Sequence, residues 1–399
     1  EHIANEMPGM EMMGTYFRMY GLTGETPVSV QLAWGNDATT AHSVARIDNY
    51  ADLPLYEPLV VDQPVGRELL ELIPADATYA TVQRSRNDAL PDLIRMSLRM
   101  SGLGEADPFA MLREQAGIDL EGGLLDHLGT GSGMYMSETS GGGGLPSLVL
   151  FIELTDEAPV RGLLDELAGR LNTFAEAEAQ GYIRMTERRL GDVRTMRLEF
   201  PGLPVPLELS LAVQHGKLWC AATPQALSAA LAQVNGDADS LYDNPEFRSA
   251  AGPGATEAIS LSWYDTERFA RRGYGATAMF MSGLANAVRS RTNPERDPGV
   301  LLPGYGDLLD NVRPSVMIAR LDGSDLVMRM RGDRSMAVNV TSMVGYVNSS
   351  LIGLALAGVA PAFALPAATE AREQARMTMS MVDARTIAMA ATIWAADHD

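Results

Sequence analysis

The chain has 399 residues and is 46% apolar, enough for two or three domains with sizeable cores. Its 31 Lys and Arg against 51 Asp and Glu give a net charge of −20. A field of that sign repels phosphate backbones, which argues against nucleic-acid binding. The single cysteine, Cys220, rules out an internal disulfide and a cysteine-based zinc cluster. Its strand-like surroundings predict a small buried hydrophobe.

Residues 1–66 are predicted to form the end of an N-terminal unit, followed by a linker. The alternation in "PVSVQLAWG" (27–35) and "AHSVARIDNY" (41–50) predicts two strands. We interpret this pair as the final hairpin of an earlier copy of the α+β unit that is predicted twice in the rest of the chain. Pro54, Pro58 and Pro64 break any helix in the segment that follows, so an extended linker is expected there.

Residues 67–235 are predicted to form a first α+β unit. Its expected elements are a strand within 70–85, helices at 88–103 and 107–117, strands at 131–138 and 146–154, a helix at 157–181, strands at 182–200, 207–215 and 217–223, and a helix at 224–234. The four consecutive glycines in "TSGGGGL" (139–145) predict a flexible hairpin loop between two of these strands.

Residues 236–334 are predicted to form a second α+β unit. It has a strand at 256–265, a long helix at 266–290, and two strands within 314–333 around an Asp-Gly turn. The order strand, helices, "LLD", strand, turn, strand therefore occurs twice, near 77–154 and 257–332. We expect an α+β fold of duplicated antiparallel units with long packed helices, followed by a C-terminal hydrophobic and amphipathic helical segment.

No group of residues in these units predicts an active site. The segment "GTGSGM" (129–134) lacks the spacing of a nucleophile elbow and the ending of a phosphate loop, so it is interpreted as a Gly-rich entry to a strand. Acidic pairs are expected by chance among 51 acids, and nothing selects one that includes Asp107, Glu153 or Asp156.

The five histidines are not spaced as metal ligands, and His127 is expected to be a surface or capping residue. The methionine clusters at 7–13 and 377–381 lack interleaved His or Cys, which favours packing over a copper site. No catalytic, cofactor-binding or metal-binding residue is therefore assigned, and the chain is not predicted to be an enzyme.

Residues 335–399 are predicted to form a hydrophobic helical tail. Residues 335–369 carry no charge, which is long enough for a membrane span. Pro361 and Pro366 are expected to kink the helix. The alternative is a buried helical hairpin against the α+β core. The residues of the expected membrane segment are Leu351, Leu354, Leu356, Val359, Phe363 and Leu365.

After Pro366 the apolar residues recur at steps of three and four, which predicts an amphipathic helix. Its expected partner face includes Val382, Met389 and Ile393. This face either packs within the chain or associates with another chain.

Two resemblances add to this interpretation. The order that contains "LIPADATYATVQRS", "GIDLEGGLLDHLG", "LVLFIELTD" and "SLYDNPEF" resembles a family of uncharacterised bacterial envelope proteins over roughly residues 60–335. That resemblance implies an extracytoplasmic α+β domain and no transferable catalytic residue. The segment from Leu351 to Asp399 resembles the N-terminal helix of type IV pilin-like and type II secretion pseudopilin-like proteins, through Leu365-Pro366, "AREQAR" (371–376) and the final "ADHD". The Glu that precedes the apolar run in pseudopilins is missing from "VGYVNSSLIG", so processing by a prepilin peptidase is not expected.

The sequence thus predicts a non-enzymatic, extracytoplasmic protein of the cell envelope, anchored to a membrane and acting in interaction or scaffolding, with a link to secretion or pilus-like machinery. Its expected partners are other envelope proteins or a second copy of itself, together with the membrane; nucleic acid is excluded, and no cofactor is predicted. Two alternatives stay open. One is a carrier that holds an apolar ligand in a Met-lined cavity, and the other is a hydrolase whose site the sequence does not reveal.

Overall fold

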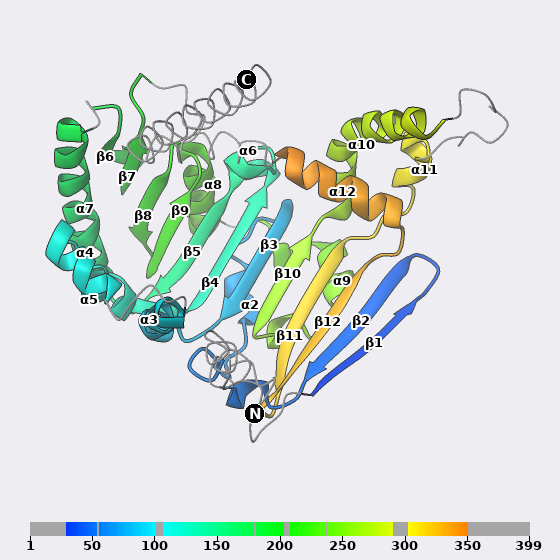
Figure 1. Ribbon diagram of the computed structural model, residues 1–399, viewed down its shortest axis with the longest axis horizontal. Helices are drawn as coiled ribbons and strands as arrows, with labels where there is room; N and C mark the ends of the chain where they lie inside the picture. The colour runs from blue at the N-terminus through cyan, green and yellow to red at the C-terminus, as the bar shows by residue number, and fades with distance from the viewer. Residues whose placement is uncertain are drawn as a thin grey trace, which may run out of the picture. The chain divides into compact units, whose positions relative to one another are not determined.

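A computed structural model describes residues 29–53, 56–100, 107–178, 181–202, 208–236, 238–289 and 302–349. Its centre is a 12-stranded sheet in the order β1-β2-β12-β11-β10-β3-β4-β5-β9-β8-β7-β6, flanked by helices (Figure 1). The prediction of an α+β fold with antiparallel strands and packed helices is confirmed. By contacts, the chain divides into two compact units, Glu1–Ser350 and Leu351–Asp399, and every described residue belongs to the first.

The strands follow the alternating segments of the sequence closely. Their bounds are β1 Val30–Asn36, β2 Thr40–Ile47, β3 Ala77–Arg84, β4 Leu128–Ser137, β5 Val149–Leu154, β6 Arg184–Leu190, β7 Val193–Glu199, β8 Ser210–Gln214, β9 Lys217–Ala221, β10 Ser260–Tyr264, β11 Ser315–Asp322 and β12 Asp325–Asp333. Short turns join several neighbours, and left-handed residues such as His215 and Gly216 between β8 and β9 allow the tight reversal.

The α-helices are α2 Gly66–Leu70, α3 Leu90–Met100, α4 Pro108–Ala116, α5 Leu120–Gly123, α6 Glu138–Gly141, α7 Glu157–Glu178, α8 Pro224–Asn235, α9 Pro245–Ala251, α10 Thr266–Val288, α11 Tyr305–Leu309 and α12 Met336–Ser349. Several begin where a polar side chain accepts hydrogen bonds from the first turn. Asp107 caps α4, Thr223 caps α8 and Asp265 caps α10 in this way.

Strands β3 and β10 pair side by side at the centre of the sheet. From β3 the chain passes through helices and returns as β4 and β5 on one side. From β10 it passes through α10 and α11 and returns as β11 and β12 on the other side. The strands of both predicted α+β units therefore lie in one continuous sheet, and the two halves follow the same order outward from its centre.

One face of the sheet, here called the core face, carries the main hydrophobic core. Helices α2, α8 and α9 cover it with buried side chains such as Leu69, Leu227 and Phe247. Trp263 and Trp219 are fully buried on this face. Each indole N–H donates to a backbone carbonyl, of Ala77 at 2.9 Å and of Gln214 at 3.2 Å, so neither buried polar group is left without a partner.

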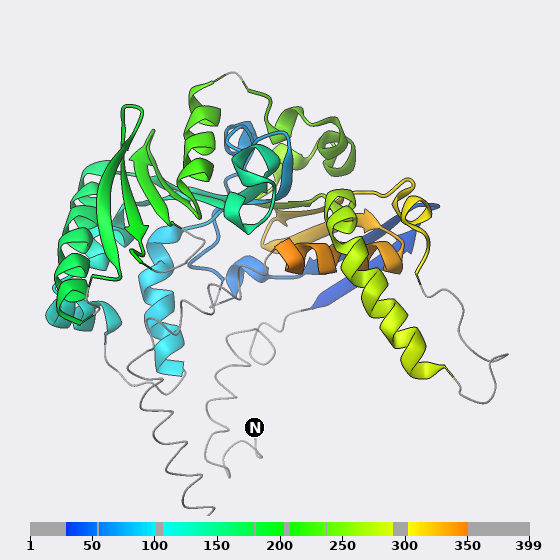
Figure 2. The ribbon, with the colours of Figure 1, turned by 90° about the horizontal axis from the view of Figure 1, so that it is seen from above.

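The opposite face of the sheet, here called the second face, is covered in separate places. At one end α7 packs on β6 to β8 through Ala168, Met185 and Met196. Over the central strands lie α10 and α12, on the side of the sheet away from α8 and α9 (Figure 2). The two faces of the sheet thus carry different sets of helices.

The predicted flexible hairpin loop at 139–145 is wrong in detail. Strands β4 and β5 do pair antiparallel, but residues Glu138–Gly141 form the short helix α6. The Ser137 hydroxyl accepts from the amide of Ser140 and starts the turn, and Gly142 ends it in the left-handed conformation that glycine adopts without strain.

Candidate functional site

Helices α10 and α12 cross at unusually close range. Gly273 of α10 faces Gly345 of α12, and a Cβ added at position 345 would lie 1.8 Å from the carbonyl oxygen of Phe269. The buried neighbours at this crossing are also small or carry a hydroxyl group: Ala270, Thr277, Thr341 and Ser342. Helices approach this closely only where small residues remove the side-chain bulk between their backbones.

The outward sides of the same two helices carry large apolar side chains. Met279 on α10 is 79% exposed and Met336 on α12 is 80% exposed. The complete set of exposed large apolar residues on this pair, here called the α10–α12 surface, is Met279, Phe280, Leu284, Val288, Met336, Val340, Met343 and Val347. The outward side of the pair is therefore apolar although it is exposed, whereas a helix in water usually carries polar residues on that side; Phe269 and Val338 are buried on the inner side.

Charge is missing from both segments that form this surface. Residues 273–288 of α10 and 336–349 of α12 include no Asp, Glu, Lys or Arg. Basic residues stand at their ends, with Arg271 and Arg272 before the first segment, Arg289 after it, and Arg334 before the second. A long charge-free helix face bounded by arginines is typical of a helix in contact with lipid.

An aromatic cluster attaches the pair to the sheet. Tyr346 of α12 packs against Tyr79 of β3 and Tyr264 of β10, with ring centroids 6.1 and 6.2 Å apart. Phe269 of α10 stacks on Tyr264 at 4.7 Å. Burial in this cluster raises the pKa of Tyr264 to about 12. The α10–α12 surface is thus held on a rigid support.

The edge strand β1 is a second unusual surface. All of its residues are exposed, and Trp34 is 82% exposed. Val30, Leu32 and Trp34 alternate along the strand and so lie on one face, and none of the seven residues is charged. The other edge, β6, carries three arginines and a glutamate in "RMTERRL". Charged residues protect β6 from pairing with other strands, and β1 lacks this protection.

The Gly-rich segment at 129–134 is structural, as the sequence suggests. It lies within β4, where added Cβ atoms at Gly131 and Gly133 would meet Glu153 at 2.5 Å and Phe151 at 2.6 Å. Beside it Arg84, whose side chain is 5% exposed, pairs with Glu153 at 2.5 Å and with Glu68 at 2.8 Å. Arg84 is the one buried member of this ion cluster, which joins β3 to β5 across β4, because the Glu153 and Glu68 side chains are 23% and 61% exposed. No local sequence pattern reveals it, because its members lie far apart in the chain.

The other residues that the sequence singled out have structural partners. Asp107 caps α4 and lies 3.2 Å from Arg95, and the carboxylate of Asp156 accepts from the amide of Ala158. The His127 Nε2 lies 3.1 Å from the Gly122 carbonyl oxygen, which agrees with a capping role. Cys220 is half-buried, and burial raises the pKa of its thiol.

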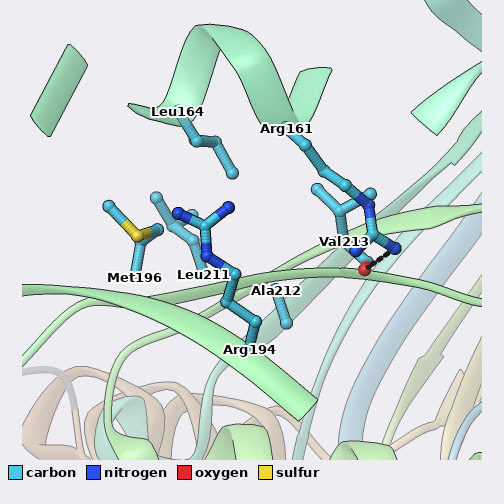
Figure 3. Close-up of a pocket in the computed structure, with 7 residues that line it drawn as sticks. All are labelled: Arg161, Leu164, Arg194, Met196, Leu211, Ala212 and Val213. Carbon is cyan, nitrogen blue, oxygen red and sulfur yellow. Dashed lines mark hydrogen bonds between the residues drawn. The ribbon is translucent and has the colours of Figure 1, made fainter. Parts of the chain in front are cut away.

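Three hollows can be assessed as ligand sites. The cavity between α7 and β7–β8 (Figure 3) has a volume of ≈ 20 Å³. Its two arginines are already paired, Arg161 with Glu157, and Arg194 with Asp165 and Glu187. That volume holds about one water molecule. A hollow of ≈ 430 Å³ near α11 is lined by Asp307, Asp310 and Asp333, among others. A third, of ≈ 370 Å³, lies beside β2, β12 and β11.

Within the described ranges, no three His, Cys, Asp or Glu side chains are grouped so that they could hold a metal ion. In the same part of the chain, no helix is both long enough and apolar enough to cross a bilayer. The predicted membrane segment, the kinks at Pro361 and Pro366, the partner face at Val382, Met389 and Ile393, and both methionine clusters lie outside the described residues.

Comparisons of the chain with protein-family models, with curated proteins and with solved structures gave no match.

Proposed function

We propose that this chain is a non-enzymatic protein of the cell envelope, located outside the cytoplasm and attached to a membrane, where it acts by binding other components. The observation that carries this proposal is the α10–α12 surface, on which eight large apolar side chains are exposed along two charge-free helix segments. In water, the free energy of folding favours burying large apolar side chains and exposing small ones. In lipid the preference is lost, and close packing of small residues holds helices together.

The proposed arrangement lays the α10–α12 surface into the interface of the bilayer. Transfer of a fully exposed Phe or Met side chain out of water contributes about 1.5–3 kcal/mol. Phe280 is 70% exposed, so its insertion contributes about 1–2 kcal/mol. The eight residues of the surface add their contributions, and the exposed Arg289 at the end of the first segment is placed to reach the headgroups.

The predicted tail supports the same position. Helix α12 ends at Ser349, and the apolar segment expected at 351–365 follows directly in the chain. A membrane anchor there brings the α10–α12 surface to the bilayer by chain connectivity alone. The proposed link to secretion or pilus-like machinery rests on the pseudopilin-like pattern of this tail, whose helix with Val382, Met389 and Ile393 would pack against a helix of a partner chain.

The finer fold prediction also belongs to this proposal. We take the α+β domain to be duplicated, because the chain follows the same order on both sides of the central β3–β10 pair. In this interpretation α10 is the counterpart of α3 to α5. The membrane-facing pair would then be a specialised feature of the second copy.

A binding role is supported by β1. An extended, uncharged edge strand can accept another strand through its free amides and carbonyls. A second copy of this chain fits it, since two uncharged β1 strands pair antiparallel without charge repulsion. The apolar carrier that the sequence left open gains no support from the three hollows described above, none of which is lined by several methionines.

The test is the partition coefficient of the full chain on zwitterionic phosphatidylcholine vesicles, measured by flotation. The α10–α12 surface and the tail each multiply the partition coefficient by their own factor. A substitution on the α10–α12 surface therefore lowers the coefficient even if the tail also binds the vesicles. Phe280→Glu is expected to lower the coefficient at least about tenfold, which corresponds to 1.4 kcal/mol. The matched control is Phe174→Glu on α7, where Phe174 is also exposed. An equal loss in both variants, or no loss in either, would contradict the proposal.

A further inference from the structure

A cationic groove lies on the core face, at the part of the sheet formed by β2, β12 and β11. Its volume is ≈ 370 Å³, which is within the range of small-molecule sites. The strands form one wall, and the end of α9 with the residues that follow it forms the other. The charged or titratable residues that line it are His42, Glu257, Arg320, Arg329 and Arg331.

The pairing register brings these cations together from distant parts of the chain. Arg329 and Arg331 are two residues apart on β12, so their side chains project from the same face of the sheet. Arg329 lies opposite Val44 of β2 on one side and Ile318 of β11 on the other. Arg320 is two residues beyond Ile318 on β11 and therefore joins the same face.

The arginines in this groove are only partly neutralised. Arg320 Nη1 lies 3.1 Å from Glu257 Oε2, while its Nε is buried and donates to no acceptor. Arg331 Nη1 donates to the Ser249 carbonyl oxygen at 3.2 Å. Arg329 has no ion-pair partner among the described residues. Three guanidiniums against the single carboxylate of Glu257 leave a formal charge of +2, in a chain whose net charge is −20.

The rest of the lining is largely apolar. It includes Ala250, Ala251, Pro253, Val316 and Ile318. Guanidinium groups bind phosphate and carboxylate oxygens in pairs, and aliphatic walls suit an apolar body. We propose that this groove binds a small organic dianion, a phosphate monoester whose oxygens meet the guanidiniums and whose body lies on the aliphatic wall.

This ligand is expected to come from solution. The groove opens on the core face, whereas α10 and α12 lie on the second face, on the other side of the sheet (Figure 2). The groove therefore does not face the proposed bilayer. The inference is independent of membrane attachment and stands or fails without it.

The experiment is isothermal titration calorimetry of the full chain with phenyl phosphate, inorganic phosphate and phenylacetate as probes. Phenyl phosphate is expected to bind saturably and more tightly than either of the others, because only it combines two charges with an apolar body. Arg329→Ala is expected to weaken its binding about tenfold, since one charge-assisted contact is lost. Arg329 is exposed on its strand, so this substitution leaves the fold intact.

Arg189→Ala is the matched control, because Arg189 is an exposed strand arginine on β6 at the far edge of the sheet. It is expected to leave phenyl phosphate binding unchanged. Absence of saturable binding at millimolar phenyl phosphate, or equal weakening by Arg189→Ala and Arg329→Ala, would overturn the assignment. If inorganic phosphate binds as tightly as phenyl phosphate, the apolar wall does not contribute to binding. If phenylacetate binds as tightly as phenyl phosphate, the site does not select a dianion.

Discussion

Gly273→Ala is the smallest change that tests the close crossing of α10 and α12. The added Cβ would lie 2.0 Å from the Thr341 carbonyl oxygen and 2.5 Å from the Gly345 amide nitrogen. Both are backbone atoms, so no side-chain rotation relieves the contact. Ordinary contact begins near 3.4 Å, and α12 must therefore move away by roughly 1.4 Å (3.4 − 2.0).

The expected loss of stability follows from two opposing contributions. Overpacking of this kind costs about 1–3 kcal/mol, and the separated helices also lose dispersion contacts along the crossing. Alanine has a better helix propensity than glycine, which returns about 1 kcal/mol. The net expectation is a loss of about 1 kcal/mol in the free energy of unfolding, the middle of the range that remains after the propensity gain.

The same helix offers a matched control. Gly275 has nothing within 4 Å of an added Cβ, so Gly275→Ala gains propensity without a clash. It is expected to raise the free energy of unfolding by about 0.5–1 kcal/mol. Urea denaturation followed by circular dichroism measures both variants. If Gly273→Ala is as stable as Gly275→Ala, the two helices do not cross at this close range.

Three further predictions follow from other parts of the molecule. Burial raises the pKa of Tyr264 from 10.0 to about 12, so the unfolded chain loses its phenolic proton first. The free energy of unfolding should be unaffected by Tyr264 below pH 10 and fall as the pH rises from 10 to 12, and Tyr264→Phe should reduce that fall in a pH series of urea denaturation curves. Arg84→Met should cost about 1–3 kcal/mol because the partly exposed carboxylate of Glu153 loses its ion-pair partner, and Arg84→Met with Glu153→Gln should recover part of the loss in the same assay. Leu32→Lys on β1 should shift any self-associated chain to the monomer in sedimentation velocity, whereas Glu187→Lys on β6 should not.

The sequence was informative where local patterns decide the structure. Alternating apolar residues placed β1, β2, β3 and β10 to β12 within a few residues. The failure at 139–145 has a local cause as well. Four glycines indicate a flexible loop, but the Ser137 hydroxyl and the left-handed Gly142 favour a helical turn there.

The candidate surfaces could not be predicted in the same way. Helix α12 was assigned to a hydrophobic tail, because its charge-free sequence does not show that Gly345 packs on Gly273 more than seventy positions earlier. The arginine groove depends on register between β2, β11 and β12, which one sequence does not specify. The alternation of Arg329 and Arg331 in "VMRMRGD" was the one available signal, and it predicts a shared face but not what lies opposite.

The central claim is that the α10–α12 surface lies in a bilayer, and the most direct test measures the depth of one residue. An environment-sensitive nitrobenzoxadiazole dye would be attached at Phe280→Cys in a Cys220→Ser background of the full chain, with Phe174→Cys as the control site. On vesicles containing lipids doxyl-labelled in the acyl chain, the dye at 280 should shift to shorter wavelength and be quenched, while the dye at 174 should not. An unshifted, unquenched dye at position 280 on vesicle-bound protein would contradict the account.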